Sequence, residues 1–147
     1  MIRKEFWKHY SIEKLTHEEW EAICDGCGKC CLIKLQTVKK EIPTYTSLSC
    51  QYLDTETCRC KVYSSRKIKQ AECITLSPKN LNKIVEWLPN SCSYRLIYEK
   101  KDLPIWHHLK SKTVNSVHKT GNSVKNLTIS ELFVDEEDFV NFINNQD

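Results

Sequence analysis

The sequence lacks the apolar segments that direct a chain into or across a membrane. Its first residues, Met1 to His9, mix charged and aromatic side chains, without the apolar stretch or cleavage site of a secretory signal. No run of residues approaches the roughly 18 apolar side chains that a membrane-spanning helix needs. These absences predict a cytoplasmic protein with no membrane contact.

The sequence also lacks a large excess of charge of one sign, and it lacks familiar catalytic motifs. The chain has 22 Lys and Arg residues against 19 Asp and Glu, a net charge of +3 at a pI near 8.3. Nucleic-acid-binding domains more often have a basic stripe and a pI above about 9, so we expect no nucleic-acid partner. The sequence contains no Gly-x-Ser-x-Gly, phosphate-binding glycine loop, His-Glu-x-x-His or paired-carboxylate signature. It therefore leaves open whether the protein is an enzyme.

Cysteine is abundant instead, with nine in 147 residues. Four of them, and two of the three glycines, fall in the run Cys24–Cys31, which reads CDGCGKCC. An odd number cannot pair completely, and in a reducing cytosol such a pattern more often indicates metal or redox chemistry than disulfides. A Cys-x-x-Cys turn brings two sulfurs to one ion, and glycine frees the backbone to fold around it. The predicted metal ligands lie within residues 24–92: Cys24, Cys27, Cys30, Cys31, Cys50, Cys58, Cys60, Cys73 and Cys92.

The identity of the metal stays open at this point. Thiolates suit zinc, copper(I) and iron–sulfur clusters. Two four-thiolate zinc sites would use eight cysteines and leave one over. The spacing Cys24–Cys27–Cys30 is similar to the beginning of a ferredoxin cluster motif, but Cys31 follows immediately instead of the usual ending. We therefore expect either zinc or an iron–sulfur cluster as the cofactor.

Local patterns predict the elements that carry these cysteines. Thr16 and Glu19 form a capping box that starts a helix over 17–24, which ends at Cys24. Residues 32–38 predict a strand. A hairpin is expected from strands near 45–53 and 58–63. On such a strand Cys58 and Cys60 would point to one face.

The register of that hairpin has two alternatives. A four-residue loop pairs Leu53 with Cys58, whereas a slip of one residue sets Cys50 opposite Cys60; shared ligation favours the slip. Ser77 caps a further helix with an apolar stripe of Leu81, Ile84, Val85 and Leu88. Cys73 and Cys92 flank that helix.

The remaining chain predicts a helix over 92–98, a second hairpin from 114–118 and 123–129, and a final helix from Asp135. Phe139, Phe142 and Ile143 are expected to face inward from this helix. His107 and His108 are adjacent, and we interpret them as core or surface residues rather than ligands. The whole predicts one small α+β domain over 1–147. Its short helices and two β-hairpins would surround a cysteine-rich metal centre, with the metal-binding core at 24–92.

At this level of detail the chain resembles a known family. The run from Trp20 to Leu32, WEAICDGCGKCCL, is similar to the signature of the YcgN-type bacterial cysteine-cluster family of zinc- or iron-chelating CxxCxxCC domains. The resemblance continues through 58–60, 87–96 and 103–107 and covers the chain from about residue 5 to its end. It implies a metal-chelating protein and assigns no reaction.

Three functions follow as hypotheses. The first is a metal-binding protein whose cysteine thiolates hold zinc or an iron–sulfur cluster. The second is an iron–sulfur-dependent redox enzyme or electron-transfer protein, which would be coloured. The third is a structural zinc module that docks an unknown protein partner, which would be colourless and would unfold with chelator.

Overall fold

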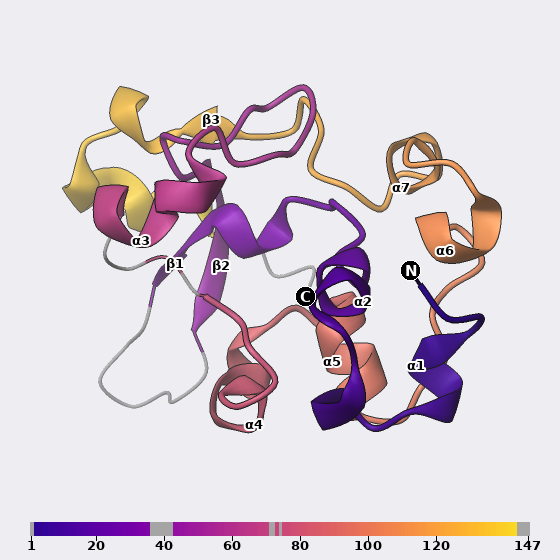
Figure 1. Ribbon diagram of the computed structural model, residues 1–147. Helices are drawn as coiled ribbons and strands as arrows, with labels where there is room; N and C mark the ends of the chain where they lie inside the picture. The colour runs from indigo at the N-terminus through magenta and orange to yellow at the C-terminus, as the bar shows by residue number, and fades with distance from the viewer. Residues whose placement is uncertain (1, 36–42, 71–72, 74, 144–147) are drawn as a thin grey trace. The chain divides into compact units, whose positions relative to one another are not determined.

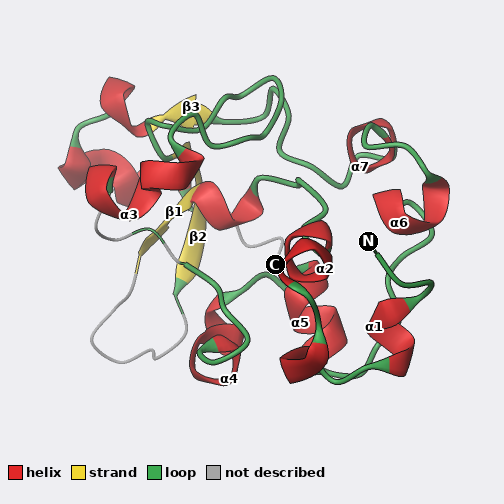
Figure 2. Cartoon of the chain, in the orientation of Figure 1, coloured by secondary structure: helices red, strands yellow, loops and turns green. Residues whose placement is uncertain are grey.

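The computed structural model describes residues 2–35, 43–70, 73 and 75–143 (Figure 1). The chain divides into two compact units, and each is described by itself. Unit 1 comprises Met1–Gly26 and Leu76–Asn122, and unit 2 comprises Cys27–Thr75 and Ser123–Asp147. Figure 2 shows short helices and loops over most of the chain, with the strands confined to unit 2. The α+β class is confirmed, and the single-domain boundary stays a prediction.

Unit 1 is helical. Its elements are α1 (Phe6–His9), η1 (Ile12–Lys14), α2 (His17–Ala22), α4 (Leu81–Ile84), η4 (Val85–Trp87), α5 (Ser93–Tyr98), α6 (His108–Ser111) and α7 (Ser116–Lys119). The predicted capping box is present at α2. The Glu19 amide donates to Thr16 Oγ1 at 3.1 Å, and the Thr16 amide donates to Glu19 Oε1 at 3.0 Å. These bonds satisfy two donors that a helix start leaves without intrahelical partners.

The core of unit 1 joins α2 to α4 and α5. Its buried members are Phe6, Trp20, Ile23, Leu81, Val85, Leu88 and Tyr94. The stripe predicted after Ser77 supplies three of these, while Ile84 is half-buried. Tyr94 lies against Trp20 with ring centroids 4.6 Å apart, and its hydroxyl donates to the Trp20 carbonyl at 2.9 Å. The packing therefore fixes α2, the helix that leads into Cys24.

Unit 2 is built on a three-stranded sheet in the order β1-β2-β3. β1 (Leu32–Leu35) pairs antiparallel with β2 (Thr44–Ser49), and β2 pairs parallel with β3 (Ile129–Ser130). The rest of unit 2 consists of η2 (Lys29–Cys31), η3 (Tyr63–Ser65), α3 (Arg66–Lys69), η5 (Glu131–Phe133) and η6 (Glu136–Phe142). β1 is the described part of the strand predicted over 32–38, whose last three residues lie outside the described residues.

The hairpin predicted over 45–63 forms only in part. Cys58 has φ of +60°, a left-handed conformation that a strand residue does not adopt, so no strand forms at 58–63. Pairing is reduced to a single antiparallel bridge between Leu53 and Cys60, which is neither of the two registers considered. The prediction that Cys58 and Cys60 share one strand face is therefore wrong.

The hairpin predicted over 114–129 is also wrong. Residues 116–119 form α7, and Val117 is buried at 2% exposure. Burying Val117 favours the helical turn over the alternating pattern that suggested a strand. The final helix predicted from Asp135 exists as the 3₁₀ helix η6, with Phe139 and Phe142 half-buried but Ile143 exposed. None of the helices in the described ranges is long and apolar enough to cross a membrane.

Candidate metal centre

Within unit 2, the charges of three predicted ligands act on the thiols of two others, Cys31 and Cys73. Cys31 and Cys30 are hydrogen-bonded, and the charges of Cys30, Cys50 and Cys60 all raise the pKa of the Cys31 thiol. The charges of Cys30, Cys60 and Cys50 likewise raise the pKa of Cys73, for which burial is the larger cause. Since such interactions weaken with distance, these five thiols share one neighbourhood, which we call the five-thiol cluster.

Sheet pairing brings two of the segments of the five-thiol cluster together. Cys30 and Cys31 end η2, immediately before β1 begins. The Cys50 amide donates to the Cys31 carbonyl at 2.8 Å, one step beyond the pair Leu32–Ser49 in the β1–β2 ladder. The antiparallel register of β1 and β2 therefore holds Cys31 and Cys50 as neighbours.

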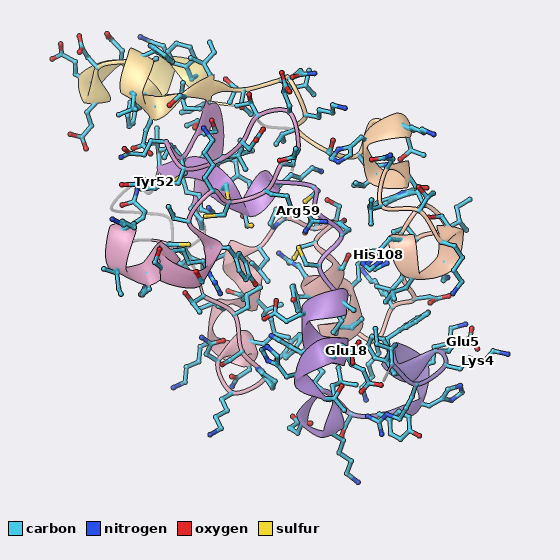
Figure 3. The ribbon with its side chains drawn as sticks, turned by 45° about the horizontal axis from the view of Figure 1, so that its top comes forward. Lys4, Glu5, Glu18, Tyr52, Arg59 and His108 are labelled. Carbon is cyan, nitrogen blue, oxygen red and sulfur yellow. The ribbon has the colours of Figure 1, made fainter. Side chains whose placement is uncertain are left out.

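The other two segments arrive from the loop and helix that follow β2. Cys60 is placed by its bridge to Leu53. Gln70, which follows α3, places its Nε2 atom 3.9 Å from the Cys50 Sγ atom, and its carbonyl accepts from the Cys73 amide at 3.0 Å. Figure 3 shows sulfur atoms gathered in the region between the labelled residues Tyr52 and Arg59.

Cations lie beside the five-thiol cluster. Lys34 Nζ donates to the Cys30 carbonyl at 2.7 Å and to the Leu32 carbonyl at 3.0 Å. Burial lowers the pKa of Lys34, and the thiolate charges of Cys30, Cys31, Cys73 and Cys50 oppose that shift. The positive charge of Arg66 opposes the rise in the pKa of Cys73 that burial causes. Lys67 Nζ also donates to the Cys73 carbonyl at 3.1 Å. These cations offset part of the charge that thiolates would bring to the cluster, and a metal cation bound among the sulfurs would offset more of it.

The spacing of the thiols bears on the kind of centre. Tetrahedral zinc with Zn–S bonds of about 2.3 Å sets its sulfurs about 3.8 Å apart. Among the residues that the structure describes, no three cysteine sulfurs lie within 4.8 Å of one another; the only three-ligand group that meets this limit is the exposed set Asp135, Glu137 and Asp138. The donor type and the neighbourhood fit a metal held by thiolates. To hold a single ion, the thiol side chains must turn toward one another.

Cys58 has a different environment from the five-thiol cluster. It is 5% exposed and belongs to an apolar group with Leu32, Leu53 and Val124. Burial raises its pKa, and a hydrogen bond with Ser123 opposes the shift. The structure therefore supports a packing role for Cys58, whereas its role as a ligand stays a prediction.

Gly28 allows the chain to pass close to this apolar group. Its φ is +77°, and a Cβ atom there would lie 2.9 Å from Val124 Cγ2 and 3.1 Å from Cys58 Cβ. The Val124 amide also donates to the Cys27 carbonyl at 2.9 Å. Gly28 is thus required both by the left-handed backbone conformation and by the lack of room for a side chain.

The remaining predicted ligands are divided between the units. In unit 2, Cys27 Sγ accepts from the Lys29 amide at 3.5 Å. In unit 1, Cys24 and Cys92 are half-buried against the same hydrophobic core. Ligation by Cys24, Cys27 and Cys92 stays a prediction.

His107 and His108 have a role that the sequence did not reveal. In unit 1, His107 Nε2 lies 2.7 Å from the Ile23 carbonyl, and its Nδ1 accepts from the Leu109 amide. The ring is therefore neutral with its proton on Nε2, and burial lowers its pKa. His108, labelled in Figure 3, places Nε2 2.7 Å from the Ala22 carbonyl and 3.2 Å from the Cys24 carbonyl.

These two histidines therefore act on carbonyl groups at the end of α2. Helix ends leave such carbonyls without intrahelical partners, and the stacked rings hold the backbone that enters Cys24. Interpreting His107 as a core residue is confirmed by its 0% exposure. No local spacing signal could have identified the carbonyl partners of the two histidines, Ile23 and Ala22, since both lie more than 80 residues away in the chain.

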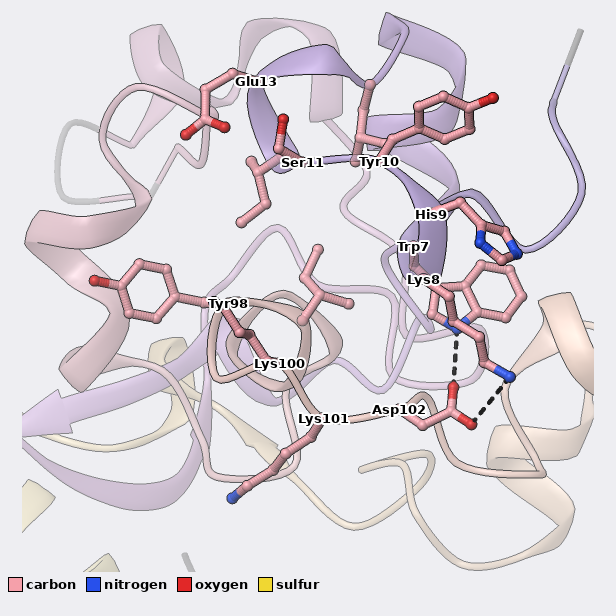
Figure 4. Close-up of a pocket in the computed structure, with 13 residues that line it drawn as sticks. Trp7, Lys8, His9, Tyr10, Ser11, Glu13, Tyr98, Lys100, Lys101 and Asp102 are labelled. Atoms are coloured by element: carbon pink, nitrogen blue, oxygen red, sulfur yellow. Dashed lines mark hydrogen bonds and ion pairs between the residues drawn. The ribbon is translucent and has the colours of Figure 1, made fainter.

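Unit 1 also contains a hollow of about 630 Å³ next to the N-terminal segment (Figure 4). No cysteine lines it. One of its two carboxylates, Asp102, accepts from Trp7 Nε1 at 2.9 Å and from Lys110 Nζ at 2.6 Å, and Lys8 Nζ lies 3.7 Å away. These contacts, of which the hydrogen bond from Lys110 has the largest effect, hold the pKa of Asp102 well below its usual range. They fix the Trp7 ring, so Asp102 has a structural role.

Comparisons with known proteins identify the family of the chain. Residues 23–93 match the CxxCxxCC family model, described as "Putative zinc- or iron-chelating domain". A UPF0260 protein of Caulobacter vibrioides (strain NA1000 / CB15N) is 44% identical over 142 residues, covering 96% of this chain and 87% of the relative. UPF0260 proteins of Parvibaculum lavamentivorans and Rhodobacter capsulatus are 46% and 45% identical, covering 90% and 97% of this chain and 86% and 95% of the relatives. No solved structure matches the chain. With such identity over nearly its whole length, the chain belongs to the UPF0260 family and carries that family's CxxCxxCC domain.

Proposed function

We propose that this protein binds zinc or iron through the thiolates of the five-thiol cluster, Cys30, Cys31, Cys50, Cys60 and Cys73. The observation that carries the proposal is the convergence of these thiols in one partly buried site. The β1–β2 ladder joins Cys31 to Cys50, and Gln70 contacts both the Cys50 sulfur and the Cys73 amide. The charges of Cys30, Cys50 and Cys60 raise the pKa of Cys31 and that of Cys73. Five thiols from four segments of the chain gain nothing from such proximity as neutral groups. As thiolates they repel one another strongly, and a bound metal removes that repulsion.

The residues around the cluster have defined tasks in this proposal. Lys34 and Arg66 offset part of the negative charge that four or five thiolates bring to a divalent metal. Gln70 lies within hydrogen-bonding distance of the Cys50 sulfur, and such contacts orient a ligand. Cys30 is the exposed member of the cluster, and it gives the site an edge toward solvent. A bound metal would supply folding energy and, as an iron–sulfur cluster, would also accept and donate single electrons.

Metal analysis with a visible spectrum, on protein purified without air, tests this proposal. Cys31→Ser removes a thiol at the centre of the five-thiol cluster, and Cys58→Ser removes one from the apolar group around Val124. We expect bound zinc or iron in the wild type, a loss of most of it in Cys31→Ser, and wild-type metal content in Cys58→Ser. Wild-type protein without metal, or Cys31→Ser with full metal content, overturns the proposal.

The colour of the protein decides between the two forms of the proposal. Brown protein that bleaches on oxidation supports the iron–sulfur form and the electron-transfer hypothesis. Colourless protein with bound zinc supports a structural role, because d¹⁰ zinc has no redox chemistry. In both forms we expect the same dependence on Cys31, since the ligands do not change.

A further inference from the structure

The end of unit 2 exposes an unusual amount of apolar surface. Six large hydrophobic side chains between residues 127 and 143 are between 40% and 82% exposed: Leu127, Ile129, Leu132, Phe133, Val140 and Ile143. We call residues 127–143 the C-terminal face. A concentration of exposed large apolar side chains is typical of interaction sites in soluble proteins.

Backbone contacts hold the C-terminal face against the sheet. β3 pairs with β2 through Leu48–Ile129 and Ser49–Ser130. The Gln51 amide donates to Glu131 Oε2 at 2.9 Å, and Ile143 forms a bridge with Thr46. These contacts use the main chain and one carboxylate, so most of the apolar side chains stay outside. These contacts therefore fix the backbone of the C-terminal face, so a partner that binds there pays less conformational entropy to order it.

The charge of the C-terminal face is entirely negative. Residues 127–143 contain five acidic and no basic residues, although the chain as a whole has a net charge of +3. A hollow of about 510 Å³ combines both properties and is lined by Phe133, Val134, Asp135, Asp138, Asn141 and Phe142. Such a lining suits a Lys or Arg side chain, whose aliphatic part would pack on the two Phe rings while its charged end lies near the Asp carboxylates.

The same unit presents a surface of the opposite charge. Residues 58–70, which we call the basic segment, contain five basic and no acidic residues. The basic segment includes η3 and α3, where Ile68 is 87% exposed and Tyr63 is 51% exposed. The basic segment therefore combines exposed apolar side chains with positive charge, and the C-terminal face combines exposed apolar side chains with negative charge. The two surfaces are complementary in charge and alike in apolar character.

We propose that the protein associates with a second copy of itself, the C-terminal face of one copy contacting the basic segment of the other. The equal and opposite charges of the two surfaces, five acidic against five basic residues, carry the proposal. Each copy offers both surfaces, so a two-fold arrangement makes the contact twice. Complementary charge also sets the orientation and makes the association sensitive to salt.

Sedimentation equilibrium of the full chain tests the proposal, at concentrations from about 10 to 500 μM because surfaces of modest size associate weakly. We expect a mass approaching twice the 17.3 kDa of one chain, and a return toward one chain mass in high salt. Phe133→Ser and Ile68→Ser should each shift the association to higher concentration. Val114→Ser, an exposed apolar residue of unit 1, should leave it unchanged.

A charge swap separates this contact from general stickiness. Lys61→Glu with Lys69→Glu reverses part of the basic segment, and Glu136→Lys with Glu137→Lys reverses part of the C-terminal face. Each double variant alone should associate more weakly than the wild type, because the net charge of the basic segment falls from +5 to +1 in one variant and that of the C-terminal face falls from −5 to −1 in the other. An equimolar mixture should associate more strongly than either variant alone, because it pairs the unchanged C-terminal face of one variant with the unchanged basic segment of the other.

The outcomes are distinguishable. A wild-type chain that is monomeric over the whole range overturns the proposal and leaves the C-terminal face for a different protein. Association as strong as that of the wild type in either double variant, or no stronger in the mixture than in each variant alone, also overturns it. Far-UV circular dichroism of each variant confirms that the fold is retained.

Discussion

Replacing Gly28 by Ala tests the packing beside the cysteine run most sharply. Gly28 has φ of +77°, and an added Cβ would lie 2.9 Å from Val124 Cγ2 and 3.1 Å from Cys58 Cβ. The left-handed conformation costs a non-glycine residue about 1–2 kcal/mol. Forcing an extra methyl group into packed surroundings costs about 1–3 kcal/mol more. We therefore expect Gly28→Ala to lower the free energy of unfolding by about 2–5 kcal/mol.

Gly121→Ala is the matched control. Its φ is +75°, nearly the same as that of Gly28, but no atom lies within 4 Å of the position of its Cβ. Only the conformational cost of about 1–2 kcal/mol remains. The change in the entropy of the unfolded chain is the same for both substitutions. The difference between the two variants should therefore isolate the packing cost of about 1–3 kcal/mol.

Denaturation in guanidinium chloride, followed by far-UV circular dichroism, measures both variants. All four tryptophans belong to unit 1, so tryptophan fluorescence identifies the transition of that unit separately. Equal losses of stability in Gly28→Ala and Gly121→Ala would refute the close approach of Gly28 to Val124 and Cys58. A loss larger in Gly121→Ala would contradict the reasoning altogether.

Three other changes have expected outcomes. Leu48→Ala should cost about 3–5 kcal/mol in chemical denaturation, because this fully buried side chain of β2 leaves a cavity; a loss below 1 kcal/mol would contradict its burial. His107→Leu removes the ring N–H from the Ile23 carbonyl and should cost about 1–3 kcal/mol, measured by thermal unfolding; wild-type stability would show that the contact is dispensable. The Arg3 guanidinium holds the pKa of Glu19 below its usual 4.5, so this carboxylate stabilises the fold above pH 4.5 and progressively less as the pH falls below it. The melting temperature of Glu19→Gln should therefore depend less on pH than that of the wild type between pH 5 and pH 3, and identical profiles would refute the Arg3–Glu19 pairing.

Where the signal is local, the sequence predicted the structure well. The Thr16–Glu19 capping box and the stripe of Leu81, Val85 and Leu88 depend on residues within two turns of one another, and both are present. The helix predicted over 92–98 appears as α5 for the same reason. Such elements are determined by capping and by the periodicity of burial, which the sequence carries directly.

Contacts between distant segments were not predictable in the same way. The left-handed conformation of Cys58 and its group with Leu32 and Val124 depend on the return of residues 123–126 to the cysteine run. Val117, predicted to lie in a strand, lies in the helix α7, where the tertiary structure buries it. The sequence predicted nine cysteines as one set of ligands, whereas the five-thiol cluster emerges only when the β1–β2 register brings Cys31 to Cys50. Registers and returns of this kind are set by tertiary packing.

X-ray absorption at the zinc and iron edges, on protein purified without air, tests the central claim most directly. Binding by the five-thiol cluster predicts at least one zinc or iron atom per chain with a first shell of sulfur at about 2.3 Å. The sulfur count should fall in Cys31→Ser and stay unchanged in Cys58→Ser. A metal-free chain, or a metal surrounded only by nitrogen and oxygen, would contradict the claim.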